Sequence, residues 1–237
     1  MTDDRTDEPE EPDDPTGSLE IVRDALAQAP PISPPPWRAV ASPALALVYD
    51  GEPERAAWIQ LGVTLEAIDV SGAAAGLAFS ADAISGPLPL LLTSSGCTIS
   101  VAAHRLAACL QRPTATLREA PLRLAAHASA RLANAAAMRE GTLAWLDSPV
   151  ALGSVAAVLP PHSLPPGVSA VGIVTSTRDD RRGLVRGGRA ACRVWLEAVS
   201  LGLVVRLLPP IDAPALASIG VRTGDAFVTA LSFGAAA

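Results

Sequence analysis

One spacing occurs twice in this chain of 237 residues. Residues 62–77 and 188–203 each begin with a glycine and reach a Gly-Leu pair whose glycine stands fourteen residues later. The residues between the glycines are small and apolar at helical spacing, and a glycine just past a helix end is a common C-terminal cap. Two copies of one supersecondary unit predict a duplicated fold whose halves pack about a pseudo-two-fold axis. A cleft between such halves is a natural ligand site.

The charge of the chain is concentrated at one end. The formal net charge is −6, but residues 1–15 alone hold eight acidic side chains against one arginine. The rest of the chain is therefore nearly neutral, and nucleic acid is not expected as a partner. Residues 1–17 are predicted to be a disordered acidic tail, because they contain few apolar side chains. This tail is interpreted as a solubilising segment, with docking to a partner protein as the alternative.

The cysteines and the apolar stretches indicate the cellular compartment in which the protein is expected. Three cysteines at positions 97, 109 and 192 are odd in number and form no Cys-x-x-Cys motif. They predict buried free thiols, with neither a disulfide framework nor a metal site. The acidic N-terminus does not resemble a secretory signal. Residues 86–103 lack charge, but their prolines and serines argue against a membrane helix. We therefore expect a cytoplasmic protein with no membrane contact and no metal.

The order of expected elements favours an α+β fold. Helical and strand patterns alternate without the regular rhythm of βαβ units. The longest patterns predict helices over residues 18–29, 56–75, 121–146 and 183–200, and strands over residues 44–49, 168–175 and 226–233.

Four arginines stand on one face of the second repeat helix. Arg182, Arg186, Arg189 and Arg193 are spaced by four, three and four residues, so they project to the same side. The favoured interpretation is a solvated polar face. The alternative is a site for a phosphate or an acidic partner, the acidic tail included.

Several motifs follow one another in the order found in nitroreductase-like flavoproteins. Residues 25–38 resemble the family's "A-x-x-A-P-S-x-x-N-x-Q-P-W-R" segment, and residues 61–66 resemble its "G-A-A-L-E-N" helix. Residues 112–122 resemble "R-x-T-x-R" followed by "R-P-V". Residues 187–203 resemble "R-A-G-x-A-L-Q-R-V-L-L-x-A-x-x-x-G-L", and residues 230–234 resemble the C-terminal strand ending "L-R-x-G".

The resemblance extends over residues 18–234 and is strongest to the Acg-like branch, whose members look like two nitroreductase protomers fused in one chain. It implies a nitroreductase-like fold with twin halves, central helices and antiparallel sheets. The first half would span residues 18–110 and the second residues 111–237. It also implies FMN between the halves, and a homodimer as a possible assembly.

The resemblance places a phosphate site after the first half. Arg112 stands where the family has its first phosphate arginine, and a guanidinium suits phosphate because its planar fork donates two parallel bonds. Thr114 matches the family threonine. The second family arginine falls on Thr116, and Arg118 stands two residues further on as a substitute.

The flavin-side segment differs more from the family. Pro31 and Pro34 stand where the family has serine and asparagine, and proline also lacks a backbone donor. Ser33 is the polar side chain that remains nearby. Trp37 and Arg38 belong to the same segment, which approaches flavin in the relatives.

Three functions follow from these observations. The leading one is an FMN-dependent oxidoreductase or flavin-using tailoring enzyme, which works by ping-pong electron transfer from a nicotinamide donor or small-molecule substrate. The alternative is a non-catalytic protein of the same fold, a pseudoenzyme that sequesters flavin, binds a ligand or serves as a partner subunit. Pro31, Pro34 and Thr116 motivate that alternative. The third is an unrelated alanine-rich interaction module, which requires a structure without a central sheet and paired helices.

Overall fold

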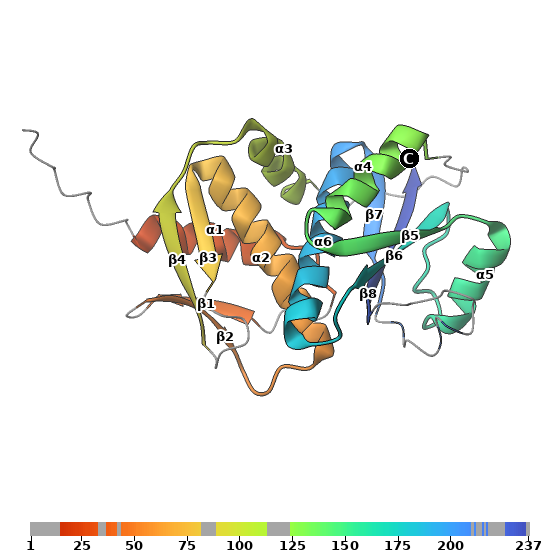
Figure 1. Cartoon of the computed structure of the whole chain (residues 1–237), viewed down its shortest axis with the longest axis horizontal. Coiled ribbons are helices and arrows are strands. Elements are labelled where there is room, and N and C mark those ends of the chain that lie inside the picture. Colours follow the sequence, from red (N-terminus) through yellow and green to blue (C-terminus); the bar gives the residue numbers. More distant parts are fainter. Residues whose placement is uncertain are drawn as a thin grey trace, which may run out of the picture.

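The computed structural model describes residues 15–32, 37–41, 44–81, 89–112, 124–209, 211, 215, 217 and 226–235. Within these residues the chain forms helices on both sides of a central crossing and two separate sheets (Figure 1). The helices are α1 (Pro15–Gln28), α2 (Arg55–Ala75), α3 (Val101–Leu110), α4 (Ala126–Ala137), α5 (Pro149–Val158) and α6 (Arg181–Ser200). The strands are β1 (Trp37–Ala41), β2 (Leu45–Tyr49), β3 (Leu77–Ala81), β4 (Leu90–Gly96), β5 (Gly141–Leu146), β6 (Ala170–Ser176), β7 (Leu203–Leu207) and β8 (Ala226–Ala235).

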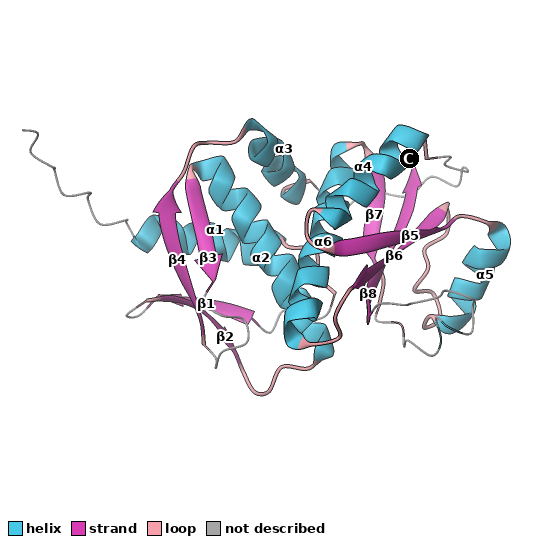
Figure 2. Cartoon of the chain, viewed as in Figure 1, coloured by secondary structure: helices cyan, strands magenta, loops and turns pink. Residues whose placement is uncertain are grey.

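The two sheets repeat one topology. The first has the strand order β1-β2-β4-β3 and the second β5-β6-β8-β7, so each strand of one sheet has a counterpart in the other. Neighbouring strands pair antiparallel throughout both sheets (Figure 2). In each half a long helix joins the second strand to the third, α2 in the first and α6 in the second. The predicted α+β fold with twin halves, central helices and antiparallel sheets is confirmed.

The first glycine of each repeat lies where the two central helices cross. A Cβ atom built on Gly62 would stand 2.0 Å from the carbonyl oxygen of Val185, on α6. A Cβ atom built on Gly188 would stand 2.1 Å from the carbonyl oxygen of Ile59, on α2. The two backbones therefore approach more closely than any side chain permits, and the approach is reciprocal. This contact explains one half of the repeated spacing.

The second glycine of each repeat ends its helix. Gly76 follows α2 with φ 83° in the left-handed region, and its N–H donates to the carbonyl oxygen of Gly72. Gly202 follows α6 with φ 77°. Glycine adopts this conformation without the clash that a Cβ atom causes. The leucine after each glycine starts the next strand, so the repeated spacing sets both the helix crossing and the helix-to-strand turn.

The two central helices lie between the sheets. Figure 1 shows α2 and α6 in the middle, with the first sheet on one side and the second on the other. The main core is built around these two helices and includes Leu61, Ile68, Val194 and Phe233. A second, smaller core lies on the opposite face of the second sheet, where Val155 of α5 packs with residues of β6 and β8.

The structure corrects two predicted elements. The helix predicted over residues 121–146 is α4 followed by strand β5, and residues 121–123 lie outside the described residues. The chain turns at Glu140, which has φ 59°, and Gly141 then packs against α6, where an added Cβ would meet Ala190 Cβ at 2.6 Å. Tertiary packing therefore overrides the helical propensity of this alanine-rich stretch. The first helix begins at Pro15, earlier than predicted, and the acidic residues 1–14 lie outside the described residues.

The structure also bears on the expectations of buried free thiols, no metal site and no membrane helix. Cys109 and Cys192 are buried free thiols as expected, but Cys97 is exposed because it follows β4 in the segment that leads to α3. No group of three or more potential metal ligands gathers among the described residues. The described helices include none that combines the length and the apolar character needed to cross a membrane.

Candidate functional site

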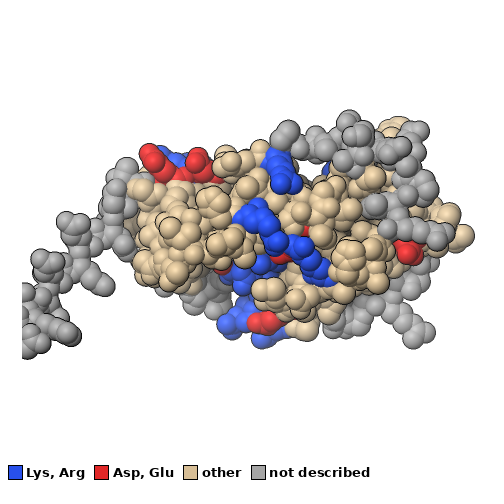
Figure 3. All heavy atoms as spheres, turned by 90° about the horizontal axis from the view of Figure 1, so that it is seen from above, with Lys and Arg blue, Asp and Glu red and all other residues tan. Residues whose placement is uncertain are grey.

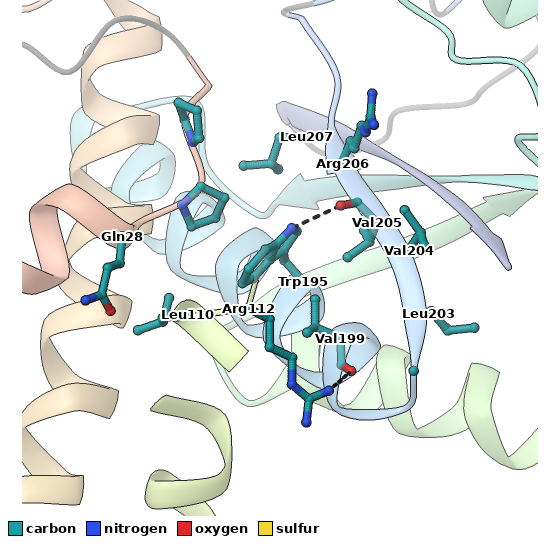
Figure 4. A pocket seen from close by; sticks show the side chains of 13 residues that line it. Gln28, Leu110, Arg112, Trp195, Val199, Leu203, Val204, Val205, Arg206 and Leu207 are labelled. Atoms are coloured by element: carbon teal, nitrogen blue, oxygen red, sulfur yellow. Dashed lines mark hydrogen bonds between the residues drawn. The ribbon is translucent and has the colours of Figure 1, made fainter. Parts of the chain in front are cut away.

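A pocket of about 610 Å³ lies where the two halves meet beside the end of α6. One wall comes from the end of α1 and the two prolines that follow it in the first half. The other comes from α6, the turn after it and β7 in the second half (Figure 4). The pocket is lined by Gln28, Pro30, Pro31, Leu110, Arg112, Trp195, Val199, Gly202, Leu203, Val204, Val205, Arg206 and Leu207. Its volume falls within the range of roughly 300–1,000 Å³ common for small-molecule sites.

The free edge of strand β7 faces this pocket. Strand β7 is the last strand of its sheet, so one edge has no neighbouring strand among the described residues. The N–H of Leu208 donates to the carbonyl oxygen of Ala230 on β8. Because backbone groups alternate in direction along a strand, those of Leu203, Val205 and Leu207 point toward the free edge. A planar heterocycle with carbonyl and N–H groups can form hydrogen bonds with such an edge.

Trp195 covers part of this edge from α6. Its indole Nε1 donates to the carbonyl oxygen of Val205 at 3.2 Å, and the indole ring forms part of the pocket wall (Figure 4). The hydrogen bond fixes the ring against β7 and leaves the apolar ring surface toward the pocket. Leu110 and Val199 extend the apolar surface beside it. The pocket thus joins an apolar wall to a row of backbone polar groups.

Two arginines give the pocket a positive rim. Arg112 follows α3 and donates from Nη1 to the carbonyl oxygen of Val199 at 3.1 Å, which anchors it at the end of α6. Its side chain is exposed, and the remaining guanidinium N–H groups are available to a ligand. Arg206 of β7 is also exposed and lies on the other side of Trp195 in the view of Figure 4. An anionic ligand is therefore favoured here over a cationic one.

Two of the four arginines predicted to form one face of the second repeat helix belong to an ion-pair network instead, whereas Arg182 is exposed and Arg186 pairs with Glu140. Arg189 and Arg193 lie largely buried against α2, where they share the carboxylate of Glu66, with Arg189 Nε 3.3 Å and Arg193 Nη1 3.5 Å from it. Arg139 completes the cluster with two bonds to Glu66, at 2.7 and 3.0 Å. The interpretation as a solvated face is wrong for these residues, because their acidic partner lies on the other central helix. These two arginines already pair with Glu66 of the same chain, so they do not need an acidic partner from another molecule.

The repeat relates this network to the pocket. Trp195 stands seven residues after the first glycine of its repeat, and Asp69 holds the same place in the other repeat. Asp69 of α2 pairs with Arg189. Its Oδ2 also lies 4.0 Å from Nη2 of Arg139, a residue of the turn that follows α4. The prolines of the pocket occupy the corresponding turn after α1. The two halves therefore share a topology but differ in chemistry, with a tryptophan-lined pocket in one place and buried ion pairs in its counterpart.

The predicted site residues fall into three groups. Arg112 lines the pocket, as does Pro31. Trp37 does not, since it is buried in the first half, where its Nε1 donates to the carbonyl oxygen of Ala57 at 2.9 Å. Arg38 is exposed and pairs with Asp50 at 2.6 Å, also away from the pocket. Trp37 and Arg38 alternate along β1, so they point to opposite faces of its sheet and not to one ligand.

The remaining predicted contacts cannot be placed. Ser33, Thr114 and Arg118 lie outside the described residues, as do Pro34 and Thr116. Their roles stay predictions. The pocket is bordered by chain segments that lead directly to these residues, because Pro31 and Arg112 both line it.

Sequence reasoning missed Trp195, Arg206 and the free edge of β7. Trp195 lies within the second repeat helix, and nothing in its neighbouring sequence distinguishes it from a core residue. The signal that could have found it is the comparison of the two repeats, because tryptophan and aspartate at matching positions cannot serve the same environment. The strand edge depends on sheet order, which the sequence alone does not specify.

Comparison with known proteins gives similarity of structure only. No protein-family model matches the sequence, and no curated protein does. A nitroreductase from Desulfovibrio desulfuricans in complex with FMN is similar, with a TM-score of 0.48 and 15% identity over 56% of this chain and 86% of that one. An NADH dehydrogenase/NAD(P)H nitroreductase from Parabacteroides distasonis gives a TM-score of 0.46 and 15% identity over 55% and 86%. A nitroreductase from Desulfitobacterium hafniense with bound FMN gives 0.43 and 15% over 56% and 89%.

Each of these three structures is described as a nitroreductase.

Proposed function

We propose that the pocket binds FMN and that the protein is a flavin-dependent oxidoreductase of nitroreductase type. The observation that carries this proposal is the meeting, in one pocket, of Arg112 with the free edge of β7. The first supplies a charged group for a phosphate, and the second supplies backbone donors and acceptors for a heterocyclic ring. The motif resemblance points to Arg112 independently of the structure.

The residues of the pocket fit the parts of FMN. Arg112 would bind the phosphate through the guanidinium N–H groups that do not bond to Val199. Trp195, with the apolar side chains around it, would cover the isoalloxazine ring and exclude water. The N–H groups of Leu203, Val205 and Leu207 would orient the polar edge of the ring. The protein's part in such chemistry is binding, orientation and exclusion of competing reactions.

Bound FMN would supply a carrier that takes two electrons from a donor such as a nicotinamide nucleotide and passes them to an acceptor, in a ping-pong sequence. In this proposal Arg206 would attract anionic donors or acceptors to the rim, because it lies at the pocket but away from Arg112. The described pocket residues include no carboxylate or histidine, so proton transfer would fall to solvent or to the substrate.

The proposal is tested by titrating FMN into the full chain and into two arginine variants. Arg112→Gln should weaken FMN binding by tenfold or more, since a hydrogen bond to a charged group contributes about 1.5–3 kcal/mol. Arg23→Gln is the matched control, because Arg23 is exposed on α1 and absent from the pocket. Equal affinity in the wild type and Arg112→Gln would overturn the assignment.

Turnover separates the enzyme from a flavin-binding protein of the same fold. The FMN-loaded protein should oxidise NADH or NADPH in the presence of an electron acceptor, at a rate above that of free FMN. Binding of FMN without such turnover would favour the non-catalytic alternative, in which the pocket sequesters flavin or serves a partner subunit.

A further inference from the structure

A second group of arginines gathers beside the pocket, at the end of α6. Arg105 of α3 and Arg131 of α4 both reach the same oxygen of Glu197, from 3.5 and 2.5 Å. Arg193 approaches the other oxygen of this carboxylate at 3.8 Å. One carboxylate therefore faces three guanidinium groups, and the group keeps a surplus of positive charge.

Part of this charge is open to solvent. The side chains of Arg105 and Arg131 are 52% and 35% exposed, whereas Glu197 is only 10% exposed beneath them. Figure 3 shows arginine atoms gathered near the middle of the face that carries α3 and α4, with few acidic atoms among them. The exposed layer is thus cationic, and the anion that partly balances it is buried below.

The geometry leaves donors free for a ligand. Arg131 holds Glu197 with Nε at 2.9 Å and Nη2, and Nη2 also reaches Ser200 Oγ at 3.1 Å, which leaves its Nη1 unused. Arg105 makes one long contact through Nη2 and keeps its other N–H groups. Two adjacent guanidinium groups with unused donors match a phosphate, which accepts several charge-assisted hydrogen bonds at once.

The arginine pair is continuous with the pocket through α6. Arg131 contacts Ser200, and Arg112 contacts the carbonyl oxygen of the preceding residue, Val199. Arg112 also follows the helix that carries Arg105. The pair therefore lies beside the end of α6 that borders the pocket.

We propose that Arg105 and Arg131 form a second phosphate site, which takes the diphosphate group of a dinucleotide whose other end occupies the pocket. The existence of an anion site follows from the arginine pair alone. The assignment to a dinucleotide, of either the nicotinamide or the flavin kind, rests on the proposed function. In that setting the site would distinguish dinucleotides from the mononucleotide FMN.

Inorganic pyrophosphate is the first probe, titrated calorimetrically into the full-length protein at low salt. Arg105→Gln should weaken its binding about tenfold, because one of two charge-assisted contacts is lost. Arg105 is exposed enough for the variant to fold, and Arg23→Gln on α1 again serves as the control. Failure of the wild type to bind pyrophosphate, or equal binding by Arg105→Gln, would overturn the anion site.

Nucleotide titrations then separate this inference from the proposed function. NADH and FAD, tested one at a time, identify the kind of dinucleotide, and at least one should bind about tenfold more weakly to Arg105→Gln while FMN binds unchanged. Dinucleotide affinities that do not respond to Arg105→Gln would refute the dinucleotide assignment even if FMN binds. Loss of pyrophosphate binding in Arg105→Gln, together with no binding of FMN by the wild type, would support the anion site and refute the proposed function.

Discussion

Replacing Gly62 with alanine should force the two central helices apart. The new Cβ atom would stand 2.0 Å from the Val185 carbonyl oxygen and 2.9 Å from the Arg189 amide nitrogen, both of which are backbone atoms. Backbone in a helix cannot rotate out of the way, so α6 must retreat by about 1 Å or more to restore normal contact. Overpacking of this kind typically costs about 1–3 kcal/mol, and we expect the upper end because the clash is with backbone.

The helix propensity of alanine offsets part of this cost. Alanine is better than glycine inside a helix by about 1 kcal/mol, so the net loss in the free energy of unfolding should be about 2 kcal/mol. For a chain of this size that corresponds to a fall in Tm of roughly 4–8 °C. Gly188→Ala should behave alike, because its Cβ would stand 2.1 Å from the Ile59 carbonyl oxygen. The double variant should lose less than the two single losses together, since one separation of the helices accommodates both.

Urea unfolding followed by circular dichroism measures the changes in the free energy of unfolding, and thermal unfolding measures the changes in Tm. Gly153→Ala is the matched control, because Gly153 is also helical but has no atom within 4 Å of an added Cβ. That variant should be stabilised by about 0.5–1 kcal/mol. If Gly62→Ala were as stable as Gly153→Ala, the helices would not cross at Gly62 and the explanation of the repeated spacing would fail.

Three further predictions concern buried charge and buried thiols. Glu66→Gln should lower the free energy of unfolding by about 3 kcal/mol, because it removes the fully buried carboxylate that three partly buried arginines share and leaves them only Asp69 and Glu197 as acidic partners. Arg38→Gln, which breaks an exposed pair, should change it by no more than about 0.5 kcal/mol, and similar losses in both would contradict the burial of the network. In the native protein an alkylating reagent should modify Cys97 rapidly and leave Cys192 unmodified, as mass spectrometry can show. Burial, and next the nearby carboxylate of Glu66, raise the pKa of Cys192 well above its ordinary value of 9.0. The unfolded chain therefore ionises this thiol first, so stability should fall as the pH rises above about 9, and Cys192→Ala should reduce that fall.

The sequence predicted the parts of the fold that depend on local rules. The helix ends at Gly76 and Gly202 follow from a requirement of the backbone, and the duplication follows from a spacing. The stretch 121–146 was misjudged because its alanine content favours a helix locally, while the packing of Gly141 against Ala190 decides the outcome. That contact joins residues far apart in the chain, so no local pattern reveals it.

In the candidate site, too, the sequence predicted what a local motif indicates and missed what depends on contacts between distant residues. Arg112 was predicted because a short motif surrounds it. Trp195 and the edge of β7 were not, because they become a site only when the sheet order is known. The pairing of Arg189 with Glu66 was also missed, since the two residues stand on different helices and each is ordinary in its own sequence context.

A structure of the protein crystallised with FMN tests the central claim most directly. The account predicts one flavin in the pocket, with its phosphate within hydrogen-bond distance of Arg112 and its ring between Trp195 and the free edge of β7. An empty pocket at saturating FMN, or a flavin bound elsewhere on the molecule, would contradict it.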